Sequence, residues 1–95
     1  MARVRRLVLD LLKPHDPDPV AFAEAVAGLD GVDGVNVALV ETDKEVQNVK
    51  ATIEGESVPV EAVHETLEDL GGAVHSIDEV VCGDRLVEQS DTPQD

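Results

Sequence analysis

Residues 32–54 read VDGVNVALVETDKEVQNVKATIE, and this stretch decides the fold. On both sides of a polar turn near Asp43-Lys44, apolar residues alternate with other residues, which is typical of two strands joined as a hairpin. The expected strands are Val32–Glu41 and Val46–Glu54. The flanking segments must therefore extend or cover a hairpin that lies in the middle of the chain.

A helix is expected on each side of this hairpin. The first begins at Asp18, a candidate N-cap, and Pro19, whose missing N–H costs nothing at the first helical position. Its end is expected at Gly31. The second begins at Pro59 and ends at Gly71-Gly72. Apolar residues recur at helical spacing in both segments, as Phe22, Val26 and Leu29 in the first and Val60, Val63, Leu67 and Leu70 in the second.

Two outer strands complete the pattern, Arg3–Leu12 and Ala73–Val81. Residues Arg85–Glu88 are expected to form a short extra strand. Residues 1–88 then make a single domain, and Gln89–Asp95 is expected to be a disordered acidic tail.

The order strand, helix, hairpin, helix, strand predicts an α+β fold of ferredoxin-like type, βαββαβ. Because crossover connections are right-handed, both helices should lie on one face of a four-stranded antiparallel sheet of order 4-1-3-2. The other face is then left without helices. We expect it to carry apolar residues, namely Val8, Leu12, Val40 and Val74 or their neighbours, and exposed apolar surface of this kind indicates a homo-oligomer.

Charge is the most unusual property of the composition. The chain has 21 acidic and seven basic residues, for a net charge of −14. Self-repulsion of this size is relieved by salt, since the Debye length falls to about 3 Å at 1 M. We therefore interpret the surface as that of a protein from a halophile, and an acidic surface for a basic partner or for cations is the alternative. Nucleic acid is not an expected partner, because binding phosphates needs clustered lysine and arginine.

The same composition excludes several other classes. Cys82 is the single cysteine, so there is no intrachain disulfide, and no cysteine cluster exists to hold a metal. No signal-like segment and no apolar run of about 20 residues is present, so we expect a cytoplasmic protein that does not bind membranes. Phe22 is the only aromatic residue, so no RNA-stacking surface is expected.

One group of side chains could form a site. In the expected topology the ends of the first two strands meet the starts of the other two, which gathers acids, imidazoles and an amide at one end of the sheet. Oxygen and imidazole ligands suit a divalent cation such as calcium or magnesium, although no cofactor is required by the fold. The candidate metal ligands are Asp10, His15, Glu41, Asp43 and His75, with Asn48 beside them.

Three arginines at the start of the chain hold three of its seven basic groups. We expect Arg3, Arg5, Arg6 and Val8 to lie at a subunit interface, where the arginines pair with carboxylates of a neighbouring copy. Solvated charges at a strand end are the alternative. No catalytic residues are expected, because Cys82 has no base in its local sequence and Ser76 points away from His75.

Several motifs taken together resemble the archaeal "domain of unknown function 211" family. They cover about residues 2–88, and the resemblance implies a ferredoxin-like fold in a ring-shaped or other multimeric assembly, with no established activity. The residues that carry the resemblance are RRLVLDLLKPH at 5–15, GVDGVN at 31–36, NVK at 48–50 and GGAVHSIDEV at 71–80.

The sequence thus favours a non-enzymatic homo-oligomer that binds a small ligand, regulates or has a structural role. Two alternatives stay open. One is a protein that binds a divalent cation at the end of the sheet, and the other is an enzyme whose site is shared between subunits.

Overall fold

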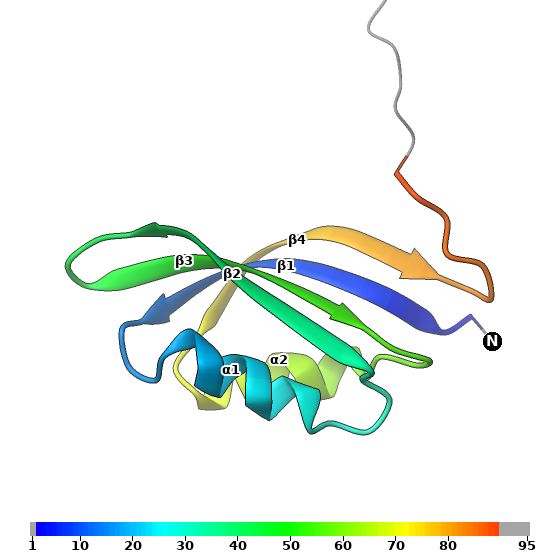
Figure 1. The fold of residues 1–95 in the computed structure, drawn as a ribbon, viewed down its shortest axis with the longest axis horizontal. Helices are drawn as coiled ribbons and strands as arrows, with labels where there is room; N and C mark the ends of the chain where they lie inside the picture. Colours follow the sequence, from blue (N-terminus) through cyan, green and yellow to red (C-terminus); the bar gives the residue numbers. More distant parts are fainter. Residues whose placement is uncertain (1, 90–95) are drawn as a thin grey trace, which may run out of the picture.

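The computed structural model describes residues 2–89, and these form a four-stranded antiparallel sheet with two helices packed on one face (Figure 1). The strands lie in the order β2-β3-β1-β4, which confirms the predicted topology. The elements are, in chain order, β1 Val4–Pro14, α1 Pro19–Ala27, β2 Gly34–Thr42, β3 Val46–Glu54, α2 Val60–Asp69 and β4 Ala73–Cys82.

Both helices begin where the sequence placed them to within a residue, but α1 is shorter than expected. The Asp18 carboxylate accepts a hydrogen bond from the Ala21 amide at 3.0 Å, and Pro19 occupies the first turn. The helix ends at Gly28, so Leu29 packs against the core from the following turn. After α2, Gly71 has a φ of +92°, a backbone conformation that favours glycine after a helix.

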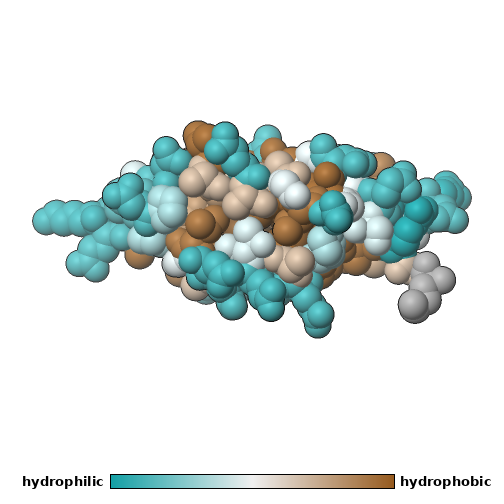
Figure 2. Space-filling model, turned by 90° about the horizontal axis from the view of Figure 1, so that it is seen from below, coloured by the Kyte–Doolittle hydropathy of each residue, from teal (hydrophilic) through white to brown (hydrophobic). Residues whose placement is uncertain are grey.

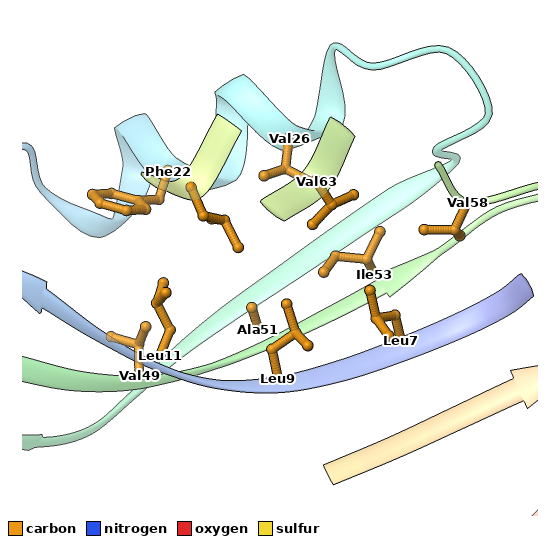
Figure 3. Packing of buried hydrophobic residues seen from close by; sticks show 11 residues of the cluster. Leu7, Leu9, Leu11, Phe22, Val26, Val49, Ala51, Ile53, Val58 and Val63 are labelled. Carbon is orange, nitrogen blue, oxygen red and sulfur yellow. The ribbon is translucent and has the colours of Figure 1, made fainter. Parts of the chain in front are cut away.

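The core lies between the helices and the sheet. Alternate residues of β1 and β3 point toward Phe22 and Val26 of α1 and Val63 of α2, as Figure 3 shows. Leu9, Leu11, Phe22 and Val49 are completely buried. The buried cluster consists of Leu7, Leu9, Leu11, Phe22, Val26, Val49, Ala51, Ile53, Val58, Val63 and Leu67.

The connections at one end of the sheet depend on two glycines. Gly31 has a φ of +96°, and a Cβ added to Gly55 would overlap the Gly31 carbonyl oxygen. Gly55 is buried and its amide donates to the Arg5 carbonyl at 3.1 Å. Only glycine fits this crossing of two backbone segments, because any side chain would occupy the space of the other segment.

The uncovered face differs from the expectation in two ways. Val74 was expected on it, but it pairs with Leu11 and packs against the core. The face is also mainly polar, because the cross-strand neighbours of Val8 and Leu12 include charged and amide side chains. Along β1 and β3 the outward residues are Arg6, Val8, Asp10, Leu12, Asn48, Lys50, Thr52 and Glu54.

Bulges explain the error at Val74. The β1–β4 pairing shifts register between Asp10 and Leu11, and again between Val8 and Leu9. Each shift leaves one residue of β4 unpaired, His75 in the first case and Asp78 in the second. Since a bulge reverses which face the following residues point to, simple alternation assigns the wrong face to part of this strand.

The C-terminal segment also differs from the expectation. Arg85–Glu88 does not form a strand, so that prediction was wrong. The segment instead leaves β4 at Gly83, where φ is +103°, and runs on the side of the sheet away from the helices (Figure 1). Of the tail expected over Gln89–Asp95, residues 90–95 lie outside the described residues.

Candidate functional site

The five predicted metal ligands do not converge. His75 lies on the outer strand β4 and Glu41 on the opposite outer strand β2, with β1 and β3 between them. Three inter-strand steps of about 4.8 Å separate these strands by about 14 Å. Within residues 2–89, no group of three or more histidine, cysteine or acidic side chains is placed to hold one metal ion.

Asp10 is joined to Asn48 on the uncovered face. The Asn48 side-chain amide donates to the Asp10 carboxylate and also to the Leu11 carbonyl, at 3.3 Å. Both residues are partly buried, in adjacent central strands. This carboxylate therefore has a local structural partner, and its position is explained without a bound ion.

His15 and Asp43 are brought together by the hairpin tip. The His15 Nε2 lies 2.6 Å from the Asp43 carbonyl oxygen. The Asp43 carboxylate accepts from the amides of Glu45 and Val46, each at 2.9 Å. These two backbone hydrogen bonds, with the charge of His15 adding a smaller effect, lower the pKa of Asp43. The arrangement closes the β2–β3 turn in the manner of an Asx turn.

A shallow pocket of about 180 Å³ lies beside this turn on the uncovered face. It is smaller than the usual range for small-molecule sites, roughly 300–1,000 Å³. Its walls combine two apolar side chains with acids and amide or hydroxyl groups, which are contributed by Leu12, Glu41, Thr42, Asp43, Val46 and Asn48.

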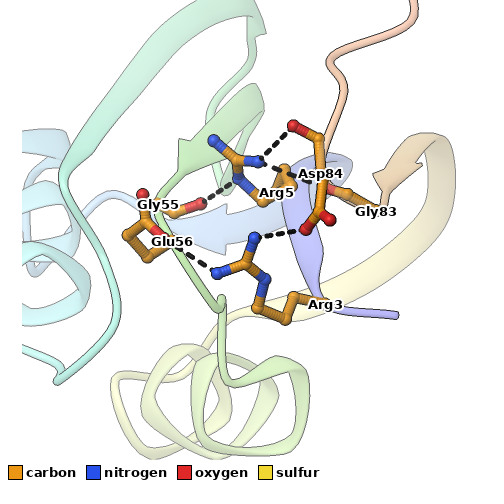
Figure 4. A network of polar contacts seen from close by, with 6 residues as sticks. All are labelled: Arg3, Arg5, Gly55, Glu56, Gly83 and Asp84. Carbon is orange, nitrogen blue, oxygen red and sulfur yellow. Dashed lines mark hydrogen bonds and ion pairs between the residues drawn. The ribbon is translucent and has the colours of Figure 1, made fainter. Parts of the chain in front are cut away.

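The three arginines have partners inside the chain. Arg3 pairs with Glu56 at 2.9 Å and Asp84 at 2.6 Å, and Arg5 donates to the carbonyl oxygens of Gly55, Gly83 and Asp84 (Figure 4). These contacts attach the loop after β3 and the segment after β4 to the start of β1.

Arg6 forms the densest charge cluster, on the uncovered face. Its guanidinium lies 2.7 Å from Glu54 of β3, 3.6 Å from Glu79 of β4 and 3.2 Å from Glu88. The hydrogen bonds with Glu88 and then Glu54 raise the pKa of Arg6, so it stays charged at every pH of interest. Val8, next to it on the same face, is only 8% exposed. The expectation that Arg3, Arg5, Arg6 and Val8 contact another copy stays a prediction, and it loses its original reason because these arginines already have partners.

Lys13 was not singled out from the sequence, yet it is the one buried charged side chain among the described residues. Its Nζ donates to the Pro14 carbonyl at 2.6 Å and to Gln47 Oε1 at 2.8 Å, and lies 5.1 Å from the centre of the Phe22 ring. Desolvation lowers the pKa of this lysine. A signal was present, because Lys13 continues the alternation of Leu7, Leu9 and Leu11.

Cys82 and Ser76 are the nucleophilic side chains considered from the sequence. Cys82 is exposed and free, and the Ser76 hydroxyl donates to Asp78 at 2.8 Å. In the part of the chain that the structure describes, no hydrogen bond links a serine, threonine or cysteine side chain to a histidine. His64 is partly buried on α2, and its Nε2 is buried without a hydrogen-bond partner.

The fold and these contacts define a small ferredoxin-like α+β domain with a polar, ion-paired uncovered face. A family whose members are described as "Uncharacterized ArCR", DUF211, matches residues 5–95. The chain belongs to this family. It is similar to "Uncharacterized protein MJ0319" of Methanocaldococcus jannaschii, with 48% identity over 95 residues that cover 100% of this chain and 98% of that protein. No helix in residues 2–89 is long and apolar enough to cross a membrane.

Proposed function

We propose that the protein is a non-enzymatic homo-oligomer with a structural or regulatory role. The observation that carries this proposal is the apolar surface on the two outer strands. Leu39 and Val40 of β2 are 52% and 60% exposed, and Ile77 and Val80 of β4 are 50% and 49% exposed. Outer strands normally carry charges, bulges or covering segments that prevent association, so large apolar groups there favour a partner.

The surface of the helix side supports the same proposal. Seen from this side, apolar atoms gather in the middle of the molecule and hydrophilic atoms surround them, most densely at both ends (Figure 2). A chain of 95 residues whose buried cluster is aliphatic apart from Phe22 has limited stability alone, and association adds buried area.

A non-enzymatic role is favoured by the chemistry of the described side chains. The described nucleophilic groups lack an attached base, and the pocket of about 180 Å³ beside the hairpin is open to solvent. We therefore place a regulatory ligand between copies, where two surfaces enclose it more completely than one open surface does. No observation favours the cation-binding alternative or the shared-site enzyme.

Salt dependence is part of the proposal. With a net charge of −14, two copies repel each other strongly at low ionic strength, and molar salt removes most of this penalty. We infer a halophilic, cytoplasmic setting, which the exposed free thiol of Cys82 also supports.

Light scattering of the purified protein in low salt and in about 1 M potassium chloride tests this proposal. We expect a mass that is a multiple of the 10.1 kDa chain at high salt, and dissociation as the salt is removed. A monomer at micromolar concentration in every salt would contradict it.

A further inference from the structure

The two outer strands differ in how well they are protected against pairing with another chain. β4 carries His75, Asp78 and Glu79, and two of its residues are bulged out of the ladder. β2 has no ionisable side chain from Gly34 to Val40, and its pairing with β3 is regular from Gly34 to Leu39. Bulges and charges protect an outer strand, whereas a regular uncharged one presents unpaired backbone groups to a partner.

We propose, building on the homo-oligomer proposed above, that β2 pairs antiparallel with β2 of a second copy about a two-fold axis. The second copy is the occupant that follows from the proposed homo-oligomer, and charge limits where it can bind. Each chain carries −14, so a stable contact must avoid opposing carboxylates. Gly34–Val40 is the part of either outer strand that meets this condition, and an isologous contact places it against itself.

The side chains favour a pairing centred on Val37. In this register Leu39 lies opposite Val35 of the second copy, on the side of the sheet that bears the helices. Leu39 is 52% exposed in the single chain, and Val35 packs only partly against the core. Pairing therefore covers both apolar groups, and the two four-stranded sheets become one continuous sheet of eight.

The ends of the paired stretch explain why salt matters for this contact. Asp33 and Glu41 flank the uncharged stretch, and the pairing brings Asp33 of each copy toward Glu41 of the other. Their repulsion is screened when the Debye length falls to about 3 Å. The contact should therefore strengthen with salt beyond what the net charge alone requires.

Cysteine crosslinking distinguishes the two edges. Ala38, Lys50, Asp10 and Ser76 form one row across the sheet, with Ala38 exposed at the β2 edge and Ser76 half-buried at the β4 edge. In a Cys82→Ser background, Ala38→Cys places two thiols on diagonal positions about 7–8 Å apart in the pair, within reach of a short bismaleimide. Ser76→Cys is the matched control.

We expect the Ala38→Cys protein to form a crosslinked dimer in about 1 M potassium chloride and the Ser76→Cys protein to stay uncrosslinked. Equal crosslinking of both variants, or crosslinking only in their mixture, would overturn the β2–β2 pairing. If light scattering shows an oligomer but the Ala38→Cys protein does not crosslink, this inference fails while the homo-oligomer stands. A monomer throughout defeats both.

A second pair of variants measures the apolar contact. Leu39→Glu and Ile77→Glu each replace an apolar residue that is about half exposed, 52% and 50%, on the helix side of an outer strand. We expect Leu39→Glu to weaken dimerisation by roughly tenfold or more, and Ile77→Glu to leave it within about twofold. The opposite ranking would overturn the inference. Circular dichroism of both variants checks that each chain folds.

Discussion

The two faces of the sheet are stabilised in different ways, although neighbouring residues of the same strand contribute to both. Leu9 points into the core and is completely buried, while Val8 points to the uncovered face, where Arg6 and its three carboxylates surround it. The covered face depends on apolar packing, which salt affects little. The uncovered face depends on ion pairs of Arg6 with carboxylates, and those of Glu54 and Glu88 are exposed, so each pair contributes little and is screened by salt. Stability should therefore come mostly from one side of the sheet.

Two cations, one on each face of the sheet, extend the comparison. Arg6 on the uncovered face is matched by three carboxylates, and Lys13 on the covered face has only a carbonyl, an amide oxygen and the Phe22 ring. The first pairing holds the C-terminal segment over the sheet. The second places a charge where desolvation opposes it, so Lys13 gives the covered face a dependence on pH.

The largest loss of stability is expected at Gly55, where there is no room for an added methyl group. Gly55→Ala forces the new Cβ into the Gly31 carbonyl, so the connections after α1 and β3 cannot both keep their places. We expect this variant to unfold or to lose more stability than any core truncation, as measured by urea unfolding followed by circular dichroism. Gly34→Ala is the control, since a Cβ there meets nothing within 4 Å. Similar losses of stability in the two variants would contradict the close backbone approach between Gly55 and Gly31.

A second prediction compares the faces directly at adjacent positions. Leu9→Ala should lower the free energy of unfolding by about 2–5 kcal/mol, because it leaves a cavity between sheet and helices. Val8→Ala should cost about 1–2 kcal/mol, because it removes two buried methyl groups, one carbon fewer than Leu9→Ala, from a face that no helix covers. Urea titrations of both variants measure the difference. Equal costs would show that the uncovered face is packed as tightly as the core in solution.

The smallest effect is expected from Lys13, and it appears in how the free energy of unfolding changes with pH. Burial lowers its pKa below the ordinary 10.5, so between those two values the unfolded chain binds more protons than the folded one. The free energy of unfolding should therefore rise with pH across that window and level off above 10.5. In Lys13→Met this part of the rise should disappear. If the free energies of unfolding of the original protein and of Lys13→Met change in parallel from about pH 7 upward, the claim that Lys13 is desolvated is contradicted.

The sequence predicted the order of elements and the sheet topology because both depend on patterns that tolerate small errors. The hairpin of residues 32–54, the cap at Asp18 and Pro19, and Gly71 after α2 each act locally. The faces of β4 were harder to predict. Two bulges within the ten residues of β4 reverse the alternation twice, and nothing in the residue types of His75 and Asp78 predicts a bulge.

The candidate site was predicted less well than the fold, and for a different reason. Topology placed Asp10, Glu41 and His75 toward one end of the sheet, but it did not account for the width of the sheet that separates β2 from β4. The partners of Arg3, Arg5 and Arg6 depend on where the segment after Gly83 runs, and no local pattern specifies that path. Alternation along the first strand predicts that Lys13 points into the core, and this was missed because lysine is so rarely buried.

The bulges of β4 also bear on how the chain can change over evolutionary time. Val74, Ile77 and Val80 pair with Leu11, Leu9 and Leu7, so the core-side residues of this strand recur every three positions instead of every two. Deleting His75 alone would leave Val74 opposite Leu11 and Ser76 opposite Asp10, so the loss of one bulged residue restores ordinary alternation at that point and turns no neighbour over. Relatives can therefore lose these residues one at a time, and each loss should bring the strand closer to the simple pattern that this chain lacks.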